Sequence, residues 1–528
     1  MPVYRLNRLC RVCFLGLGFV LLLAVAGCDD APSNSEHAAA DHPGSGPLQP
    51  VLIADTQGAT SDTWEAIFLQ GAKVGYGQTV TRTIDSHGEK IVQTEAASRL
   101  TVVRKGDAIE QEIRATSWET PAGELLHFNC ELRTGSLPTL IKGTVQGDKL
   151  VMQTTTAGKT ETSTLPWSKG WGGFQATEQS LQKQPMQPGE KRKLKQFELG
   201  LLQIADVELK AIGREPTLLL DHSEDLLRIE RTLAMPGGQT MQQLLWTDRS
   251  GELLKSRFEA FNNESFRCAK EFALQPGNSG RFDLILNNFV KVDRPIANPH
   301  ATKRIRYLVQ VEGGDPLRLF PAGLTQSLKP LDKGTAELTV RAVRPGAMPE
   351  RIDKNQLEPE PTEDDRAPNN LVQSDDAKVV ALAKQAAGSE TDPWIIAQRL
   401  EKFVHNYIKK KDFSQGFATA AEVAANPEGD CTEHAVLLAA LARAEHIPAR
   451  CCIGLVYVGS SGFGYHMWTE AWIDGHWIPL DATLGQGGIG AAHLKLASTN
   501  LKGVSAFSAF LPVAHVMGKL KVKVLEVE

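Results

Sequence analysis

The hydrophobic pattern of this chain changes its period partway along, which rules out one repeating fold. Between about residues 64 and 294, short segments alternate apolar and polar side chains, with turn residues between them, as β-strands do. Beyond residue 370, apolar side chains recur about every 3.6 residues, so residues 377–387 and 394–407 are predicted to form amphipathic helices. A chain of 528 residues also exceeds what one hydrophobic core usually organises. We therefore predict a multidomain protein with an antiparallel β-rich N-terminal region and an α+β C-terminal domain.

Composition excludes several classes of protein. A hydrophobic fraction of 42% and a charged fraction of 23% are those of an ordinary globular protein, not of a polytopic membrane protein or a disordered chain. The net charge of -5 gives no electrostatic basis for binding nucleic acid. Eight cysteines are too sparse for a disulfide scaffold, and the Cys10–Cys13 pair has no second pair to complete a zinc site. We expect no metal and no cofactor.

The N-terminus has the pattern of an export signal. Three arginines within residues 1–11 precede an apolar run over residues 12–27, which is short for a membrane span and typical of a secretory signal. The run ends in Leu-Ala-Val-Ala-Gly before Cys28, which resembles the lipobox of bacterial lipoproteins. We therefore predict a signal peptide over residues 1–27 and lipidation of Cys28, which would anchor the exported protein at an extracytoplasmic face of the cell envelope. The alternatives are an ordinary signal peptide and an uncleaved anchor.

Shifts in composition divide the rest of the chain. Residues 28–60 are rich in Ala, Ser, Pro and Gly and predict a flexible tether. Residues 346–370 concentrate Pro, Asp and Glu and predict an interdomain linker. Between these segments we expect β-rich structure over residues 61–295 and a small β unit over residues 296–345. Residues 371–528 then form the last domain.

A faint repeat lies within the β-rich region. Trp118 followed by Gly123-Glu-Leu-Leu recurs as Trp246 followed by Gly251-Glu-Leu-Leu. This predicts either two tandem curved sheets or one large sheet that uses the same hairpin twice. The region could be a ligand-binding half-barrel, but the pattern favours a spacer or docking domain. Cys130 and Cys268 lie in this region and could pair or be separately buried.

One short segment of the last domain carries the chemistry. In Gly429-Asp-Cys-Thr-Glu-His-Ala, Asp430 is a good N-cap, and Glu433 three residues later completes a capping box. This places Cys431 at the first position of a helix, where the helix dipole and backbone N–H groups favour a thiolate and later an oxyanion. His434, one turn along, is a less favoured candidate base.

Strands predicted after this helix carry the other candidate catalytic groups. His466 and Asp481 lie on neighbouring strands, so they could serve Cys431 as general base and orienting acid. Trp468 and Glu470 share the face of His466 and could line the cleft, although packing and a salt bridge account for them equally well. The predicted strands are residues 449–458, 465–473 and 477–481.

Four motifs in order resemble the transglutaminase-like superfamily of papain-related folds. They are Gly-Asp-Cys-Thr-Glu-His-Ala, Ile-Pro-Ala-Arg, Tyr-His-Met-Trp-Thr-Glu and Trp-Ile-Pro-Leu-Asp-Ala-Thr, and the resemblance covers residues 371–528. It implies that Cys431 is the nucleophile, His466 the base and Asp481 the orienting acid. Ala482 departs from the pattern, since proline is common at that position. Acidic clusters like the calcium sites of the animal enzymes are absent from the sequence, so calcium activation is not expected.

These patterns predict an envelope-anchored thiol enzyme. Its substrate would be a protein or peptide amide, attacked through a cysteine thioester and resolved by an amine or by water. The alternative is a non-enzymatic envelope binding or scaffold lipoprotein whose catalytic fold is vestigial. The retained Cys, His and Asp favour the enzyme.

Overall fold

A computed structural model describes the chain from residue 51. The described ranges are 51–86, 88–104, 107–134, 137–234, 240–259, 262–277, 289–344, 358–410, 417–459, 462–503, 512–513 and 518–528. The predicted signal peptide, the lipidation site Cys28 and most of the predicted tether therefore lie outside the described residues.

The N-terminal part is one antiparallel sheet of 14 strands, which confirms the predicted β-rich class. Along the sheet the order is β8-β7-β6-β5-β4-β3-β2-β1-β14-β13-β12-β11-β10-β9. The strands are β1 (Ser61–Leu69), β2 (Ala72–Ser86), β3 (Glu89–Arg104), β4 (Asp107–Glu119), β5 (Leu125–Arg133), β6 (Thr139–Gln146), β7 (Lys149–Thr156), β8 (Lys159–Pro166), β9 (Lys191–Glu198), β10 (Gln203–Leu218), β11 (Ser223–Ala234), β12 (Thr240–Thr247), β13 (Leu253–Phe258) and β14 (Asn263–Cys268).

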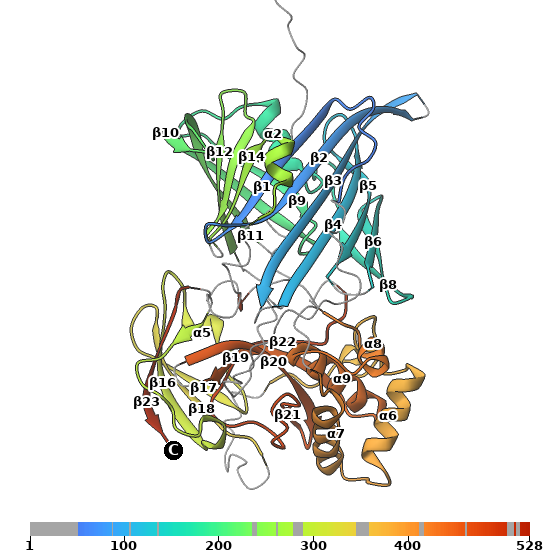
Figure 1. Cartoon of the computed structure of the whole chain (residues 1–528), viewed down its shortest axis with the longest axis vertical. Coiled ribbons are helices and arrows are strands. Elements are labelled where there is room, and N and C mark those ends of the chain that lie inside the picture. The colour runs from blue at the N-terminus through green and yellow to red at the C-terminus, as the bar shows by residue number, and fades with distance from the viewer. Residues whose placement is uncertain are drawn as a thin grey trace, which may run out of the picture.

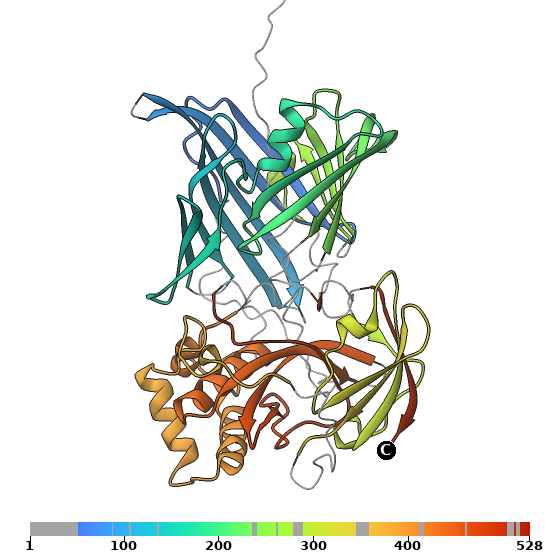
Figure 2. The ribbon, with the colours of Figure 1, turned by 180° about the vertical axis from the view of Figure 1, so that it is seen from behind.

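Neighbouring strands follow one another along the chain except where β1 pairs with β14. That pairing aligns Trp64 with Cys268 and joins the first and last strands of the region into a single sheet. The repeated sequences form two hairpins of this sheet, β4–β5 and β12–β13, so the tandem-sheet alternative is wrong. Figures 1 and 2 show the sheet curled into two facing walls, with helix α2 (Ala176–Lys183) between them. Helix α3 (Lys270–Leu274) follows β14.

Two smaller sheets form the C-terminal part. One has the order β17-β18-β16-β23, so the last strand of the chain completes a sheet built from residues 304–341. The other has the order β15-β20-β19-β22, with β21 paired to β20. Their strands are β16 (Arg304–Val311), β17 (Gln326–Pro330), β18 (Thr335–Arg341), β23 (Leu520–Val527), β15 (Val290–Lys291), β19 (Ala449–Val458), β20 (Gly462–Ile473), β21 (His476–Leu480) and β22 (His493–Thr499).

Helices of the C-terminal part pack together around one long buried helix, α9 (Cys431–Ala444). Every residue of α9 from Cys431 to Arg443 is buried, because other helices cover one side of it and β20 covers the other. The Thr469 side chain of β20 donates a hydrogen bond to the Ala435 carbonyl of α9 at 2.9 Å and fixes this contact. The remaining helices are α5 (Pro316–Leu319), α6 (Ala377–Ala387), α7 (Pro393–Tyr407) and α8 (Ala420–Ala425), with 3₁₀ turns at Pro299–Ala301 and Glu363–Asp365.

Part of the predicted linker is packed structure. Residues 358–370 lie against the C-terminal domain, where the Pro359 carbonyl accepts a hydrogen bond from the Trp477 indole at 2.8 Å. Glu358 forms ion pairs with Arg450 and Lys495 of the central strands. Glu358 of this acidic segment therefore forms ion pairs that are largely shielded from solvent. The predicted domain boundaries stay predictions.

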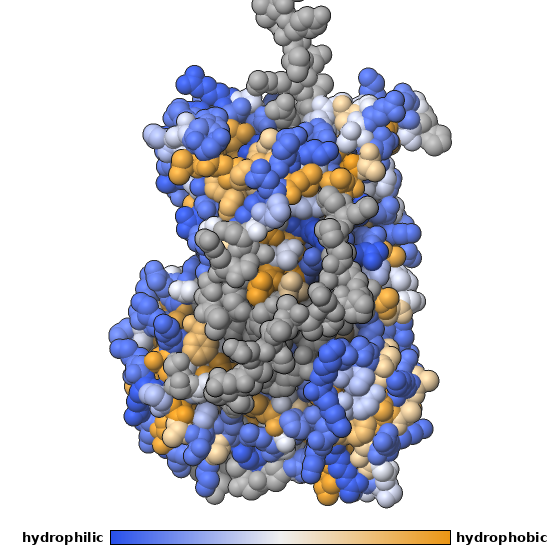
Figure 3. Space-filling model, viewed as in Figure 1, coloured by the Kyte–Doolittle hydropathy of each residue, from blue (hydrophilic) through white to orange (hydrophobic). Residues whose placement is uncertain are grey.

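On the face shown in Figure 3, hydrophobic side chains gather in patches between larger hydrophilic areas. Among the described residues, no helix combines the length and the apolar character that crossing a membrane requires.

Candidate active site

Cys431 lies at the first position of α9, as predicted. The Asp430 side chain accepts the Thr432 N–H at 2.8 Å, and the Glu433 carboxylate accepts the Asp430 N–H at 2.9 Å, which completes the capping box. Gly429 enters the helix at a φ of 147°, where a Cβ atom would come within 2.4 Å of the Glu433 side chain, so glycine is required. The thiol therefore sits in a fixed, buried position at the positive end of the helix dipole.

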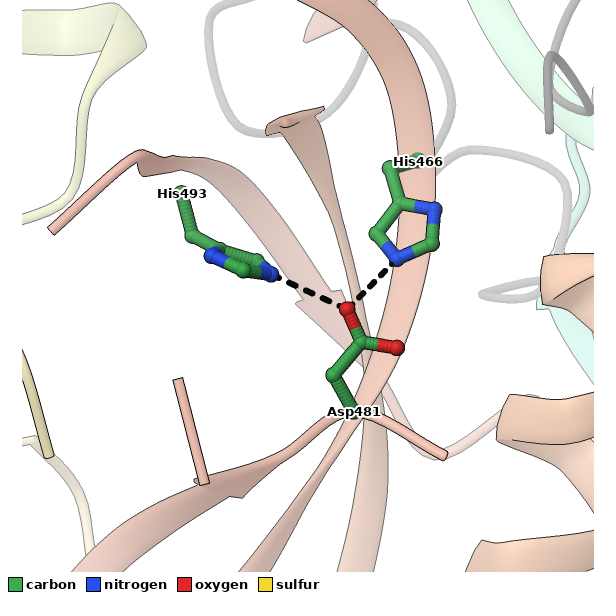
Figure 4. A group of neighbouring side chains, drawn as sticks. All are labelled: His466, Asp481 and His493. Atoms are coloured by element: carbon green, nitrogen blue, oxygen red, sulfur yellow. Dashed lines mark hydrogen bonds and ion pairs between the residues drawn. The ribbon is translucent and has the colours of Figure 1, made fainter. Parts of the chain in front are cut away.

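His466 of β20 and Asp481, the residue directly after β21, are brought together by the pairing of these two strands. The Nε2 atom of His466 lies 2.8 Å from Oδ2 of Asp481, and both side chains are fully buried. Figure 4 shows the Nδ1 atom of His466 on the side of the ring away from Asp481. A carboxylate at Nε2 holds the ring proton there and leaves Nδ1 as the basic nitrogen. Because α9 packs on β20, the helix that carries Cys431 lies against the strand that carries His466.

Asp481 is held ionised despite its burial. Burial alone would raise its pKa, but the two imidazoles of His466 and His493 outweigh this effect and keep the pKa of Asp481 well below its ordinary value. Its Oδ1 atom accepts the backbone N–H of Thr483 at 2.9 Å. The carboxylate is therefore hydrogen-bonded through both of its oxygens.

His493 is part of this cluster, and the sequence analysis missed it. Its Nε2 atom lies 3.0 Å from the same Oδ2 atom of Asp481 that binds His466 (Figure 4). The residue comes from β22, which lies beside β19 on the side away from β20. A usable signal was the alternation around His493 in His-Leu-Lys-Leu, which is typical of a strand but says nothing about which strand it joins.

These three side chains have the composition of a metal site. Each of His466, Asp481 and His493 offers one ligand atom, and these atoms lie within 4.8 Å of one another. Two imidazole N–H groups that share one ionised carboxylate oxygen also account for the arrangement as a hydrogen-bonded cluster.

Trp468 lies beside the two histidines. Its ring stacks on that of His466 at a centroid distance of 6.2 Å and meets that of His493 edge-on at 5.4 Å. Gly454 makes room for it, because a Cβ atom there would come within 2.6 Å of the indole. Trp468 therefore packs against the candidate base.

Glu470 serves in a buried ion cluster. Its carboxylate binds Lys495 at 2.7 Å and Arg450 at 2.8 Å, so of the two alternatives for this residue the salt bridge is the one observed. Burial alone would raise its pKa, but the two cations lower the pKa of Glu470 to about 2. Glu358 joins the same cations from the segment before the domain.

Loss of Lys495 should destabilise the fold strongly. Lys495→Met leaves the buried carboxylate of Glu470 and the partly buried carboxylate of Glu358 with one cation, and breaking a buried ion pair costs about 3 to 5 kcal/mol. Urea unfolding should show this loss. The control is Lys502→Met, because Lys502 pairs with Asp364 at the surface and such pairs contribute about 1 kcal/mol or less. Equal losses in the two variants would contradict the importance of the cluster.

Glu401 of α7 binds backbone N–H groups at Asp481 and Gly488, next to the candidate site. Its fully buried carboxyl group accepts the N–H groups of Asp481 at 3.2 Å and Gly488 at 3.0 Å. Burial raises the pKa of Glu401 to about 8, and the charge of Asp481 adds to the shift. Glu401 is therefore protonated at neutral pH.

The raised pKa of Glu401 makes stability depend on pH. The unfolded chain ionises this group near its ordinary value and the folded chain only near pH 8, so its contribution to stability falls as pH rises between these values. Glu401→Gln stays neutral, so its stability relative to wild type should rise by about 3 kcal/mol between about pH 5 and pH 8. Urea unfolding of both proteins at the two pH values measures this. A constant difference between them would contradict the prediction.

The other cysteines of the described chain differ from Cys431 in their setting. Cys130, Cys268, Cys451 and Cys452 are free thiols, so the structure does not pair Cys130 with Cys268. Burial raises the pKa of Cys130 and Cys451 to about 12 and that of Cys268 to about 11. These thiols therefore stay protonated and unreactive at neutral pH.

His434, the less favoured candidate base, is held within its own helix. Its Nδ1 atom lies 2.5 Å from the carbonyl oxygen of Asp430, the N-cap residue. His466, in contrast, has a carboxylate partner, Asp481, directly after the neighbouring strand β21. The geometry therefore favours His466 as the base.

Comparison with known proteins finds one family model that matches part of this domain. Residues 380–482 match the model of the transglutaminase-like superfamily, which confirms the predicted resemblance. The matched range contains Cys431, His466 and Asp481 but ends before His493. No curated protein matched the chain.

Several solved structures are similar to parts of the chain. A candidate cysteine protease from Cytophaga hutchinsonii is 16% identical, with 43% of this chain and 85% of that chain covered and a TM-score of 0.27. The periplasmic domain of TgpA from Pseudomonas aeruginosa, bound to ethylmercury, is 14% identical, with 35% and 91% covered and a TM-score of 0.22. A β-barrel-like protein of the family DUF1849 from Brucella abortus is 10% identical, with 39% and 96% covered and a TM-score of 0.30.

Proposed function

We propose that this chain is a thiol enzyme that acts on protein or peptide amides through a thioester on Cys431. The observation that carries the proposal is the contact of 2.8 Å between Nε2 of His466 and Oδ2 of Asp481, both fully buried. His466 lies on β20, against which α9 packs, and Asp481 directly follows β21, which pairs with β20. A buried imidazole oriented by an ionised carboxylate can take a thiol proton and stabilise the imidazolium that results. The start of α9 favours the thiolate.

The first half of the reaction forms the thioester. His466 takes the thiol proton of Cys431 at Nδ1, while its Nε2 proton stays hydrogen-bonded to Asp481. The thiolate attacks the amide carbonyl carbon, and the positive end of α9 stabilises the oxyanion. The C–N bond then breaks, and the leaving nitrogen takes the proton from His466, so that ammonia or an amine departs.

The second half resolves the thioester. Water or an amine gives a proton to His466 as it attacks the acyl carbon, and the C–S bond breaks. The thiolate of Cys431 recovers the proton. Water as the acceptor gives hydrolysis, and an amine gives acyl transfer with a new amide bond.

We further propose that this enzyme acts in the cell envelope. The arginines, apolar run and lipobox-like ending of residues 1–28 support export and a lipid anchor on Cys28. In this arrangement the β-rich domain comes between the anchor and the catalytic domain in the chain. The substrate would then be a protein or peptide on the extracytoplasmic side of the membrane.

Incubation with a defined substrate tests the proposed reaction. The full-length chain in detergent is mixed with a glutamine-containing protein and a fluorescent primary amine, and amine incorporation, ammonia and released peptides are measured. Wild type is compared with Cys431→Ala. We expect a product from wild type alone.

Each product identifies a different outcome. Labelled protein indicates transamidation, ammonia without label indicates amide hydrolysis, and shorter peptides indicate peptide-bond cleavage. Equal inertness of wild type and Cys431→Ala would contradict the enzyme and favour the binding or scaffold alternative.

A further inference from the structure

Two histidines share one oxygen of Asp481. The Nε2 atoms of His466 and His493 lie 2.8 Å and 3.0 Å from Oδ2 (Figure 4). An ionised carboxylate only accepts hydrogen bonds, so both imidazoles must donate an Nε2–H to it. The same oxygen therefore binds the candidate base on one side and His493 on the other.

Burial favours the neutral form of His493, because it lowers the pKa of the imidazole. Asp481 opposes this shift, and the neighbouring imidazole of His466 adds to it. The other groups that face this cluster are the ring of His300, 5.9 Å from that of His493, and Glu401, which accepts the Asp481 N–H. A neutral His493 that donates Nε2–H carries its proton toward Asp481.

His493 also packs against Trp468, which stacks on the candidate base His466. Its ring meets the Trp468 indole at an interplanar angle of 83°, and the same indole stacks on His466 at 23°. β22 holds His493 through its pairing with β19, where His493 lies opposite Val456. His493 therefore contacts both the Asp481 carboxylate and the Trp468 indole, which are the partners of His466. It does so from β22, which lies outside the β20–β21 hairpin.

We propose that His493 is a positioning residue that holds Asp481 toward His466, an inference that rests on the proposed function. With His493 in place, Oδ2 of Asp481 is fixed by two N–H groups and Oδ1 by the N–H of Thr483. The carboxylate then has one orientation, and His466 keeps its proton on Nε2 and its basic nitrogen at Nδ1. Without His493, Asp481 loses a buried donor and can rotate away from the base.

The test measures the reactivity of the Cys431 thiol, so it needs no knowledge of the substrate. The rate of alkylation by iodoacetamide is followed against pH with EDTA present, and modified Cys431 is quantified by peptide mass spectrometry. The variants are His493→Phe, which keeps a ring against Trp468 but has no donor, and His493→Gln, whose amide can donate to Asp481. His300→Leu is the matched control, because His300 touches the His493 ring from another element.

We expect wild type to react through a thiolate that persists below neutral pH. His493→Phe should lose about 10- to 100-fold in rate near pH 6, the range typical of supporting hydrogen bonds at active sites. His493→Gln should retain most of the rate, and His300→Leu should follow wild type. Thermal melting of each variant, followed by circular dichroism, checks that the fold is kept. If His493→Phe does not fold, the folded His493→Gln variant provides the test. A loss of its Cys431 alkylation rate near pH 6 would then overturn the inference.

Two results overturn the inference. One is a His493→Phe variant with the wild-type pH profile, and the other is a His300→Leu variant that loses as much as His493→Phe. Either result, with an activated wild type, leaves the proposed function standing. A wild-type Cys431 that reacts only like an ordinary thiol contradicts the proposed function as well.

Discussion

Replacement of Cys431 by alanine should lower kcat/KM on any amide substrate by about 10⁴-fold or more, because loss of a nucleophile leaves only binding and oxyanion stabilisation. The fold should persist, since the change removes one buried sulfur and the capping groups Asp430 and Glu433 stay in place. Steady-state kinetics on the substrate found in the incubation experiment measure the loss.

Cys451→Ala is the matched control for this change. Cys451 is as buried as Cys431, with 1% of each residue exposed, but it lies on β19, and burial raises the pKa of its thiol to about 12. The variant should keep the activity within about threefold while losing some stability. Comparable loss of activity in both variants would show that core packing, and not the thiol of Cys431, was responsible.

Replacement of Asp481 by asparagine should lower kcat/KM by about 10³- to 10⁴-fold, because the wrong tautomer of His466 is favoured. In wild type both carboxylate oxygens accept N–H groups, from Thr483 on one side and from His466 and His493 on the other. An amide has one oxygen. If that oxygen accepts the backbone N–H, the amide NH₂ faces the imidazoles and moves the proton of His466 to Nδ1, the atom that must accept the thiol proton.

The control for Asp481→Asn is the same change in the turn between β20 and β21. Asp474 lies in this turn at a φ of 51°, which asparagine adopts readily, so Asp474→Asn should leave kcat/KM unchanged. The dependence of kcat/KM on pH distinguishes the two variants. Asp481→Asn should lose the activity that wild type shows at low pH, whereas Asp474→Asn should keep it. Activity near the wild-type level in Asp481→Asn would contradict the assigned role of Asp481.

Local features of the site could be predicted from sequence because they depend on neighbours in the chain. The capping box of Asp430 and Glu433 is a contact over three residues, and the structure confirms it. The same holds for α6, for β20, which carries His466, and for β21, which ends directly before Asp481. A short turn at Gly475 joins these two strands.

Other features depend on contacts between distant segments. The pairing of β1 with β14 joins residues about 200 positions apart, and no local pattern specifies it. His493 reaches Asp481 because β22 pairs with β19, so the short sequence motifs could not predict this contact. The alternation along the strand predicts that Glu470 shares a face with His466. Its ion cluster depends on the fold, which brings Lys495 and Glu358 together beside it.

The most direct test of the thiol mechanism is acylation of the enzyme by p-nitrophenyl acetate. We expect a burst of p-nitrophenol equal to the amount of enzyme, with the acetyl group found by mass spectrometry on the peptide that contains Cys431. The burst should be absent in Cys431→Ala and slow in Asp481→Asn. A steady release without a burst, unchanged in Cys431→Ala and with acetyl groups spread over lysines, would contradict this mechanism.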